Sequence, residues 1–350
     1  MKIALLTIWR EKNYGAELQA YATIKTLQQL GYDVKMIDIR LSDCLCSNWK
    51  GHIGRFISQF GPSHKKFCSF WEKHIPTTRR YKSISEIQAN PPLADIYIVG
   101  SDQVWNPQLT RDFAKLYFLD FGNYKTKRIS YASSFGTEKW NFPSLKDDIG
   151  KLLNRFSHIT CREDSGVRML KNEFGLDAKQ VVDPTLLLES YTDLTGETEE
   201  KETLVYYPLS YDSELEEYSK SLAKKMGMTA INNKQCSTIL KIAEWDRVSI
   251  AKWVKNIAEA KFVITRSFHG MVFSIIHKRQ FAVVAGSHGR STRLTSLLKL
   301  LGLEDRFFES IESLNKAEPW TKIIDYSTIT PRLKEIRQNS IDILKNCIES

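Results

Sequence analysis

The sequence lacks the signatures of several protein classes. None of its six cysteines forms a CxxC pair and no histidine cluster accompanies them, so a zinc site is not expected. Scattered single cysteines are typical of the reducing cytoplasm, which is the location we expect. No segment approaches the ~20 consecutive apolar residues of a membrane span. The GxGxxG motif, internal repeats and low-complexity tracts are also absent, so a dinucleotide fingerprint is excluded.

What is present is typical of a soluble globular protein. The chain has 350 residues, of which 42% are hydrophobic and 26% charged, and this length favours two domains. The net charge of +9 suits an anionic ligand, a nucleic acid or an anionic membrane surface, and a solvated basic surface is the simplest explanation. No block of lysine and arginine is long enough for a nucleic-acid tail, so we expect no nucleic-acid partner. The opening MKIALLTIWREK predicts a first strand rather than a signal peptide, because charge ends its apolar run and no small-residue cleavage site follows.

Strand and helix patterns alternate along the chain. A buried strand over residues 3–8, a helix over about 16–30 and a strand over 34–39 open it, and such a β-α-β order predicts a parallel sheet in an α/β fold. Residues 189–202 are polar, acidic and non-periodic, and the alternation restarts at 204. We therefore predict an N-terminal domain over 1–190 and a C-terminal domain over 203–350, with a final amphipathic helix that packs back.

Residues 41–81 differ from their surroundings in composition. This stretch interleaves aromatic with basic side chains, namely Trp49, Phe56, Phe60, Phe67, Phe70 and Trp71 with Lys50, Arg55, Lys65, Lys66, Lys73, Arg79 and Arg80. Two interpretations stay open for it. It is either a helical insertion that covers the sheet edge or the cleft, or an interfacial helix in peripheral contact with a membrane.

The segment 261–274, KFVITRSFHGMVFS, is the strongest candidate for an active site. An apolar strand ends in a polar turn that feeds a helix. Ligands of open α/β sheets bind at the carboxyl ends of the strands, and a helix N-terminus there offers N–H groups to an anion. Arg266 and His269 place a permanent cation and a titratable group at this junction. A lone histidine after a strand is more often structural, but here Arg266, Ser267 and a helix start converge on it.

Other polar residues follow further predicted strands. Arg162 opens a helix, where a cation opposes the helix dipole unless an anion binds there, and Arg290 and Arg293 lie in the first turn of a later helix. GSDQVWNP (100–107) surrounds a tryptophan with hydrogen-bonding side chains, a composition that suits a sugar as well as a structural turn. Asn13 and Gly15 belong either to a ligand-binding loop or to a simple turn.

Several of these motifs together resemble the polysaccharide pyruvyl transferase family. They are NYG (13–15), LQAYA (18–22), GSDQVWN (100–106), REDS (162–165), DPT (183–185) and TRSFHG (265–270). They follow one another in family order and cover nearly the whole chain.

The resemblance implies a GT-B-like architecture, with two Rossmann-type domains of mainly parallel sheets facing across a cleft. It also implies transfer of pyruvate from phosphoenolpyruvate to a sugar as a ketal, with release of phosphate. The acceptor would be a polysaccharide or its lipid-linked precursor, as in exopolysaccharide or capsule biosynthesis, in the cytoplasm or at the inner face of the membrane. No cofactor is implied, and no metal is required where arginines neutralise the phosphate.

The resemblance also assigns roles to individual residues. His269 matches the family's essential histidine and is expected to act as general acid/base and phosphate contact, while Arg162 matches an arginine used on the donor. The family often has arginine two residues before this histidine. Here Ser267 occupies that position and Arg266 precedes it, so we expect Arg266 or Arg293 to supply the second cation. On the acceptor side, the candidates are Asn13, Gln103, Trp105 and Asn106.

Two other functions are consistent with the same pattern. A GT-B glycosyltransferase that uses a nucleotide sugar would need a carboxylate for the ribose near the donor helix, and the sequence indicates none well placed after His269. A non-catalytic carbohydrate- or carrier-lipid-binding relative would have kept the fold without the chemistry. The retention of both His269 and Arg162 argues against this second alternative.

Overall fold

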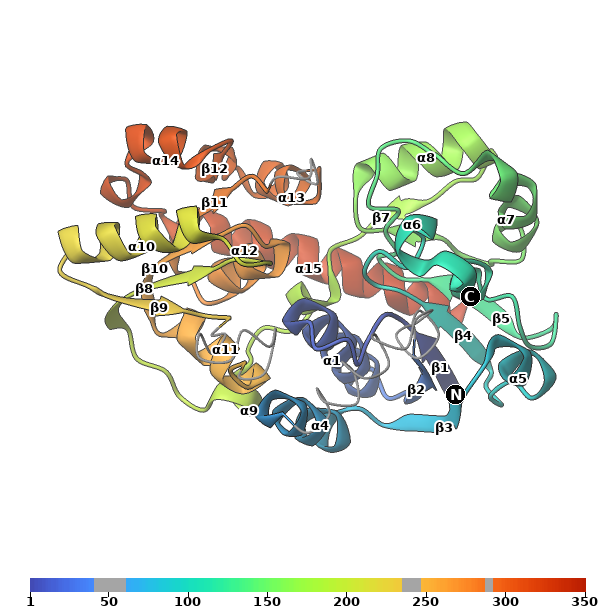
Figure 1. Cartoon of the computed structure of the whole chain (residues 1–350). Coiled ribbons are helices and arrows are strands. Elements are labelled where there is room, and N and C mark those ends of the chain that lie inside the picture. Colours follow the sequence, from blue (N-terminus) through green and yellow to red (C-terminus); the bar gives the residue numbers. More distant parts are fainter. Residues whose placement is uncertain (41–60, 235–246, 287–291) are drawn as a thin grey trace. The chain divides into compact units, whose positions relative to one another are not determined.

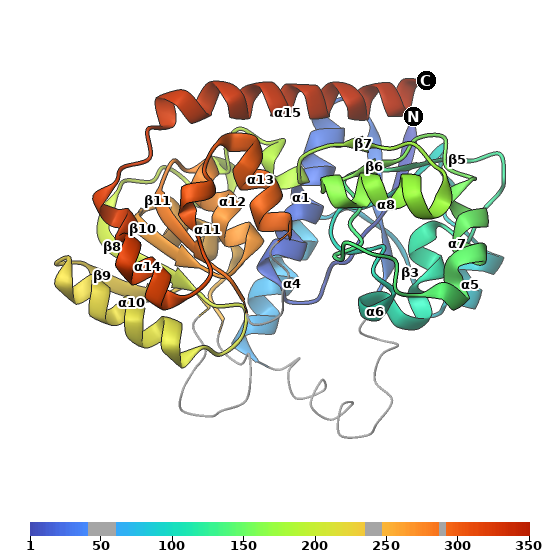
Figure 2. The same cartoon turned by 90° about the horizontal axis from the view of Figure 1, so that it is seen from above.

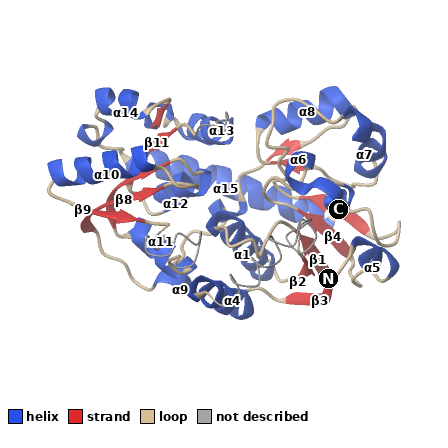
Figure 3. Cartoon of the chain, in the orientation of Figure 1, coloured by secondary structure: helices blue, strands red, loops and turns tan. Residues whose placement is uncertain are grey.

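The computed structural model describes residues 1–40, 61–234, 247–286 and 292–350, and these form two compact units (Figure 1). Of the described residues, unit 1 contains 1–40, 70–188 and 334–350, and unit 2 contains 61–69 and 189–333. The main change between the units falls at Leu188 and Glu189. Figure 3 shows that a sheet flanked by helices is the plan of each unit.

The sheet of unit 1 has five parallel strands in the order β3-β2-β1-β4-β5. Its strands are β1 (Lys2–Leu6), β2 (Asp33–Ile39), β3 (Thr77–Tyr81), β4 (Ile96–Val99) and β5 (Lys127–Ser130). The short pair β6 (Thr160–Cys161) and β7 (Lys179–Gln180) continues beside β5 through isolated bridges. Strand order reverses between β1 and β4, so the loops after these two strands meet at one crevice.

The helices of unit 1 cover both faces of its sheet. They are α1 (Tyr14–Gln29), α5 (Ile84–Ala89), α6 (Pro107–Thr110), α7 (Lys146–Leu153) and α8 (Asp164–Phe174). α1 is buried along nearly its whole length and packs against β2 and the 3₁₀ turn η4 (Pro184–Leu186). α4 (Pro62–His74) and α15 (Tyr326–Glu349) contribute residues to both units.

Unit 2 also has a five-stranded parallel sheet, in the order β12-β11-β10-β8-β9. Its strands are β8 (Lys201–Tyr207), β9 (Thr229–Asn232), β10 (Ala260–Thr265), β11 (Gln280–Val284) and β12 (Phe307–Phe308). Its helices are α9 (Thr192–Thr195), α10 (Ser213–Lys225), α11 (Ile250–Ala258), α12 (Phe268–Ile276), α13 (Thr292–Leu301) and α14 (Ile311–Ala317). Here strand order reverses between β8 and β10, and the turn after β10 is the 265–270 motif.

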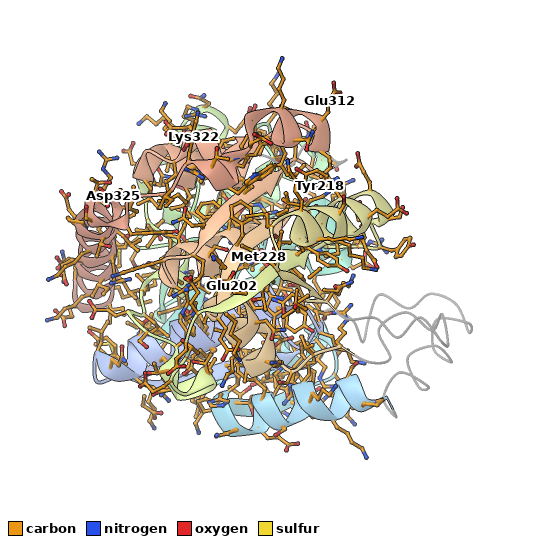
Figure 4. All side chains as sticks on the ribbon, turned by 90° about the vertical axis from the view of Figure 1, so that its left-hand side faces the viewer. Glu202, Tyr218, Met228, Glu312, Lys322 and Asp325 are labelled. Atoms are coloured by element: carbon orange, nitrogen blue, oxygen red, sulfur yellow. The ribbon has the colours of Figure 1, made fainter. Side chains whose placement is uncertain are left out.

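Alternate residues of the unit 2 strands supply its two cores. Tyr206 and Ile264 point to the face covered by α10 and α14, whereas Tyr207 packs its ring on Trp253 of α11 on the other face. Figure 2 shows α10 beside β8 and β9, and Figure 4 labels Tyr218 on α10 and Glu312 on α14. Both faces are buried, which explains the continuous apolar runs of these strands.

The α/β class and the two Rossmann-like halves were predicted correctly. The interpretation of 41–81 as a helical insertion was wrong at its end, because residues 77–81 form β3, the edge strand of the unit 1 sheet. In α4 the aromatic side chains of Phe67, Phe70 and Trp71 are buried, so this helix packs them inside the protein. Residues 41–60 of the stretch lie outside the described residues. Among the helices that the structure describes, none is long and apolar enough to cross a membrane.

Gly270 allows α12 to start close to the end of β10. A Cβ at Gly270 would lie 2.4 Å from Thr265 Oγ1. That oxygen is held in place, because it donates to Tyr207 O and accepts from Ser267 N. We expect Gly270→Ala to lower the free energy of unfolding by about 1–3 kcal/mol, measured by urea denaturation.

Gly150 in the middle of α7 is the matched control for that substitution. A Cβ there would meet Phe174 Cδ1 at 3.7 Å, an ordinary contact. Gly150→Ala is therefore expected to stabilise by about 0.5–1 kcal/mol. Equal effects of the two substitutions would contradict the close approach inferred at Gly270.

Candidate functional site

A cavity of about 600 Å³ opens in unit 2 at the carboxyl ends of its strands. Its walls come from the loops after β8, β10, β11 and β12 and from the start of α13, so it lies at the reversal of strand order. The lining residues are Leu209, Ser210, Tyr211, Asp212, Ser213, Glu214, Arg266, Phe268, Ala285, Gly286, Arg293, Leu294, Glu309, Ser310 and Ile311. Two predicted donor contacts, Arg266 and Arg293, thus line one cavity.

Arg266 is fixed in this cavity by protein oxygens. Its Nε lies 2.6 Å from Asp212 Oδ2 and its Nη2 3.1 Å from Glu214 Oε2, while Nη1 donates to Ala285 O. Asp212 is also the N-cap of α10, because its Oδ1 accepts from Leu215 N at 2.9 Å. The two carboxylates more than offset the charge of the guanidinium, so the α10 side of the cavity carries no net positive charge.

The start of α12 forms another part of the site. Ser267 is the N-cap, with its Oγ accepting from Gly270 N at 3.3 Å. Phe268 lines the cavity, and the Arg293 guanidinium lies 5.9 Å from the centre of its ring. His269 lies in the first turn of α12 and is 7% exposed, but it is not among the described residues that line the cavity. The predicted histidine is therefore next in sequence to the cavity wall, not part of it.

In unit 1, Arg162 is buried among three carboxylates. Its Nη1 donates to Asp183 Oδ2 at 2.7 Å and its Nε to Glu163 Oε1 at 3.0 Å, while Nη2 lies 3.6 Å from Asp102 Oδ1. Burial alone would lower the pKa of Arg162, but the carboxylates of Glu163 and Asp183 raise this pKa by more. The net shift is therefore upward from an already high value. These carboxylates, rather than a bound anion, offset the cation at the start of α8. Direct contact of Arg162 with a donor stays a prediction.

The same cluster joins several motifs that lie far apart in the sequence. Asp183 accepts from Ser101 Oγ at 3.2 Å and from Thr185 Oγ1 at 2.6 Å. Gln19 of α1 accepts from Ser101 N at 3.3 Å and donates to Thr7 Oγ1 at 2.9 Å. The LQAYA, GSDQVWN, REDS and DPT motifs therefore meet in one buried hydrogen-bonded network at the β1–β4 crevice.

The expected acceptor contacts of the 100–107 loop point inward. Trp105 is 0% exposed, donates from its indole N–H to Tyr117 O at 3.0 Å and stacks on Phe118. Gln103 and Asn106 are buried and hydrogen-bonded to each other, and Asn106 also caps α6. The expected stacking role of Trp105 does not fit this placement, since its ring belongs to the core of unit 1 and no face of it is open to a sugar.

Asn13 caps α1, and its side chain accepts from the amides of Gly15 and Ala16. One turn into the helix lies Glu17, which sequence reasoning missed. Its carboxylate accepts from Trp71 Nε1 at 2.7 Å and from the backbone N–H groups of Arg10 and Glu11. Burial raises the pKa of Glu17 to about 8, although these hydrogen bonds lower it.

Sequence reasoning also missed most of the cavity lining in unit 2. Tyr211 and Asp212 lie in the turn between β8 and α10 and Glu214 in the first turn of α10, so their place after a strand end was a usable signal. Glu309 follows the two-residue strand β12, which is too short for a periodic pattern to reveal. Within residues 1–40, 61–234, 247–286 and 292–350, no three His, Cys, Asp or Glu side chains are grouped to hold a metal ion.

Comparison with known proteins gives a family and a fold. The family model described as polysaccharide pyruvyl transferase matches residues 13–288. No curated protein matches the chain significantly. The UDP-GlcNAc 2-epimerase of Neisseria meningitidis bound to UDP-GlcNAc is 11% identical, covers 99% of both chains and has a TM-score of 0.56.

Two further solved structures have the same architecture. The UDP-N-acetylglucosamine 2-epimerase of Rickettsia bellii is 11% identical over 99% of this chain and 95% of its own, with a TM-score of 0.53. The glycotransferase of kitacinnamycin is 10% identical over 99% of this chain and 98% of its own, with a TM-score of 0.51. At such low identity these likenesses show the GT-B fold alone.

The buried ion pairs of Arg162 predict that loss of its guanidinium destabilises the fold. Removing the guanidinium leaves Glu163 and Asp183 buried without their cation, so Arg162→Ala is expected to cost about 3–5 kcal/mol in the free energy of unfolding. Arg168→Ala is the control, because its ion pair with Asp164 is exposed and contributes about 1 kcal/mol or less. Similar losses in the two variants, measured by urea denaturation, would contradict a structural role for Arg162.

Glu17 predicts a pH dependence of stability. Because its pKa is about 8 in the fold and 4.5 in the reference state, the folded protein keeps a proton that the unfolded chain releases. Its contribution is complete below about pH 4.5 and is lost as the pH rises through about 8. Glu17→Gln should flatten the decline in unfolding free energy between these values and leave the variant more stable than wild type above about pH 8.

The exposed Glu72 on α4 provides the control for Glu17. Glu72→Gln should leave the pH profile of urea denaturation unchanged. A Glu17→Gln profile that parallels wild type would show that Glu17 titrates normally.

Proposed function

Since the chain belongs to the polysaccharide pyruvyl transferase family, we propose that it transfers the pyruvate moiety of phosphoenolpyruvate to a sugar as a ketal and releases phosphate. One structural observation supports the proposal in addition to family membership. The motif 265–270 starts α12 beside a cavity lined by Arg266 and Arg293, which is where a sheet of this order binds ligands.

The donor is proposed to bind at the start of α12. Phosphoenolpyruvate carries a phosphate and a carboxylate, and arginine pairs with both groups through two parallel hydrogen bonds. Arg293 supplies the main cation, and Arg266 lines the same cavity with its guanidinium already paired to Asp212 and Glu214. Ser267 satisfies Gly270 N, and the preceding amides of the first turn suit an anion. Arg162 has the supporting role of holding the unit 1 loops together.

The proposed reaction balances as three proton transfers, two C–O bonds formed and one C–O bond broken. Protonated His269 gives a proton to the methylene carbon of phosphoenolpyruvate, and the double-bond electrons form the new C–H bond. A sugar hydroxyl attacks the resulting electrophilic C2 and loses its proton to the neutral imidazole. The C2–O bond to phosphate then breaks, and the second hydroxyl closes the ketal as its proton leaves with phosphate.

A specific observation favours a second candidate, a glycosyltransferase that uses a nucleotide sugar. The sequence indicates no well-placed carboxylate for a ribose after His269, but in the structure Glu309 lines the cavity and supplies one. Two similar structures are UDP-GlcNAc 2-epimerases, and one of them is bound to UDP-GlcNAc. The product separates the candidates, since this reaction releases a nucleoside diphosphate and ketal formation releases phosphate.

The test is phosphate release from phosphoenolpyruvate across a panel of sugar and lipid-linked acceptors. His269→Ala is expected to lower kcat by about 100-fold to 10,000-fold, the usual size of general acid catalysis. His158→Ala is the control, because this partly buried histidine of unit 1 lies two residues before β6 and bonds Ser350. Equal release by His269→Ala and wild type, or release of a nucleoside diphosphate from a nucleotide sugar instead, would remove the proposal.

A further inference from the structure

We propose that the acceptor sugar binds in the cavity of unit 2, on its α10 side, with Tyr211 as the stacking ring and Glu214 and Glu309 as hydroxyl acceptors. This inference rests on the proposed function only in naming the sugar as the acceptor. It differs from the expectation that residues 1–190 bind the acceptor.

The size of the cavity supports a second ligand beside the donor. A phosphoenolpyruvate of about ten non-hydrogen atoms is small for a cavity in the size class that holds drug-sized ligands. At about 600 Å³, the cavity has room for the donor at the start of α12 and for a sugar ring beside it.

The charge distribution in the cavity favours a neutral polyol on its α10 side. Asp212 and Glu214 pair with Arg266 at 2.6 and 3.1 Å, so this group carries one formal negative charge in excess. A second anion would be repelled there, whereas the hydroxyl groups of a neutral sugar donate hydrogen bonds to carboxylates. Arg293 lies against Phe268, at the start of α12 rather than α10. The cavity is thus divided into a cationic part for the donor and a carboxylate-rich part for a polyol.

Exposed apolar side chains on the cavity wall provide a surface on which a sugar ring can stack. Leu209 is 54% exposed and Tyr211 is 85% exposed, and both line this cavity. Binding sites combine such apolar and aromatic surface with a few polar groups, and a pyranose presents a C–H face to a ring and its hydroxyls to the rim. Trp105, the aromatic that the sequence suggested for stacking, is wholly buried.

One turn of the chain holds these parts together. Tyr211 immediately precedes Asp212, which caps α10 and also pairs with Arg266. Tyr211 therefore lies next in the chain to the residue that holds Arg266 in the cavity. This arrangement would place a bound sugar next to a donor at the start of α12.

The experiment measures binding of methyl glycosides of galactose, glucose and mannose to the full chain by saturation-transfer NMR and calorimetry. Tyr211→Ala is expected to weaken glycoside binding about tenfold, whereas Tyr211→Phe keeps the ring and should bind like wild type. Phosphoenolpyruvate affinity, titrated separately, should be unchanged in both variants. Glu309→Gln should also weaken the glycosides, since it removes a charged acceptor.

Tyr124→Ala is the matched control, because Tyr124 is 83% exposed and lies in unit 1. The inference is overturned if Tyr211→Ala binds glycosides like wild type, if Tyr124→Ala is equally impaired, or if wild type binds no glycoside of the panel. It is also overturned if UDP is the ligand that Tyr211→Ala loses. Glycoside binding that depends on Tyr211 without phosphate release from phosphoenolpyruvate would support the subsite and remove the proposed function instead.

Discussion

Every neighbouring strand pair of the two main sheets runs parallel, and each sheet reverses its strand order once. Parallel strands must be joined by crossovers, so all the loops that leave the carboxyl ends gather on one edge. At the reversal the two central loops turn away from each other and leave a crevice. In unit 1 this crevice is filled by a buried polar network, whereas in unit 2 it is an open cavity. The same topology therefore holds a buried network in one unit and an open cavity in the other.

The network of unit 1 explains why its motif residues are polar although they are buried. Among the described residues, Asp183 accepts hydrogen bonds from Ser101, Arg162 and Thr185, whose donors would otherwise be buried without an acceptor. Gln19 and Ser101 connect α1 to the loop after β4 in the same way. Removing these polar groups from water costs free energy, which offsets much of what their hydrogen bonds contribute to stability. The main effect of the network is therefore to specify a single arrangement of the loops.

The fold was predictable from the sequence because its signals are local. Apolar runs over 3–8, 204–209 and 262–265 mark buried strands, and polar residues after them mark loops at strand ends. Burial of particular polar and aromatic residues was not predictable. Arg162 is close to Asp102 and Asp183, which are 60 and 21 residues away, and only the folded chain brings them together. Trp105 has the polar neighbours of a sugar site, but they cap helices and bond to one another.

The departure of the 265–270 motif from the arrangement that the resemblance implied has a physical consequence. An arginine two residues before His269 would occupy the N-cap of α12, where its side chain offers no acceptor for the first-turn amides. Ser267 fills this position and accepts from Gly270 N. The arginine of this turn is instead Arg266, directly after β10, where it pairs with Asp212 and Glu214 at the start of α10. The N-terminus of α12 thereby gains a cap. Because two carboxylates offset the charge of Arg266, this side chain adds hydrogen-bond donors at defined positions rather than net positive charge. In the proposed donor site the positive charge comes chiefly from Arg293 and from the dipole of α12, whereas the α10 side of the cavity carries the carboxylates of Asp212 and Glu214.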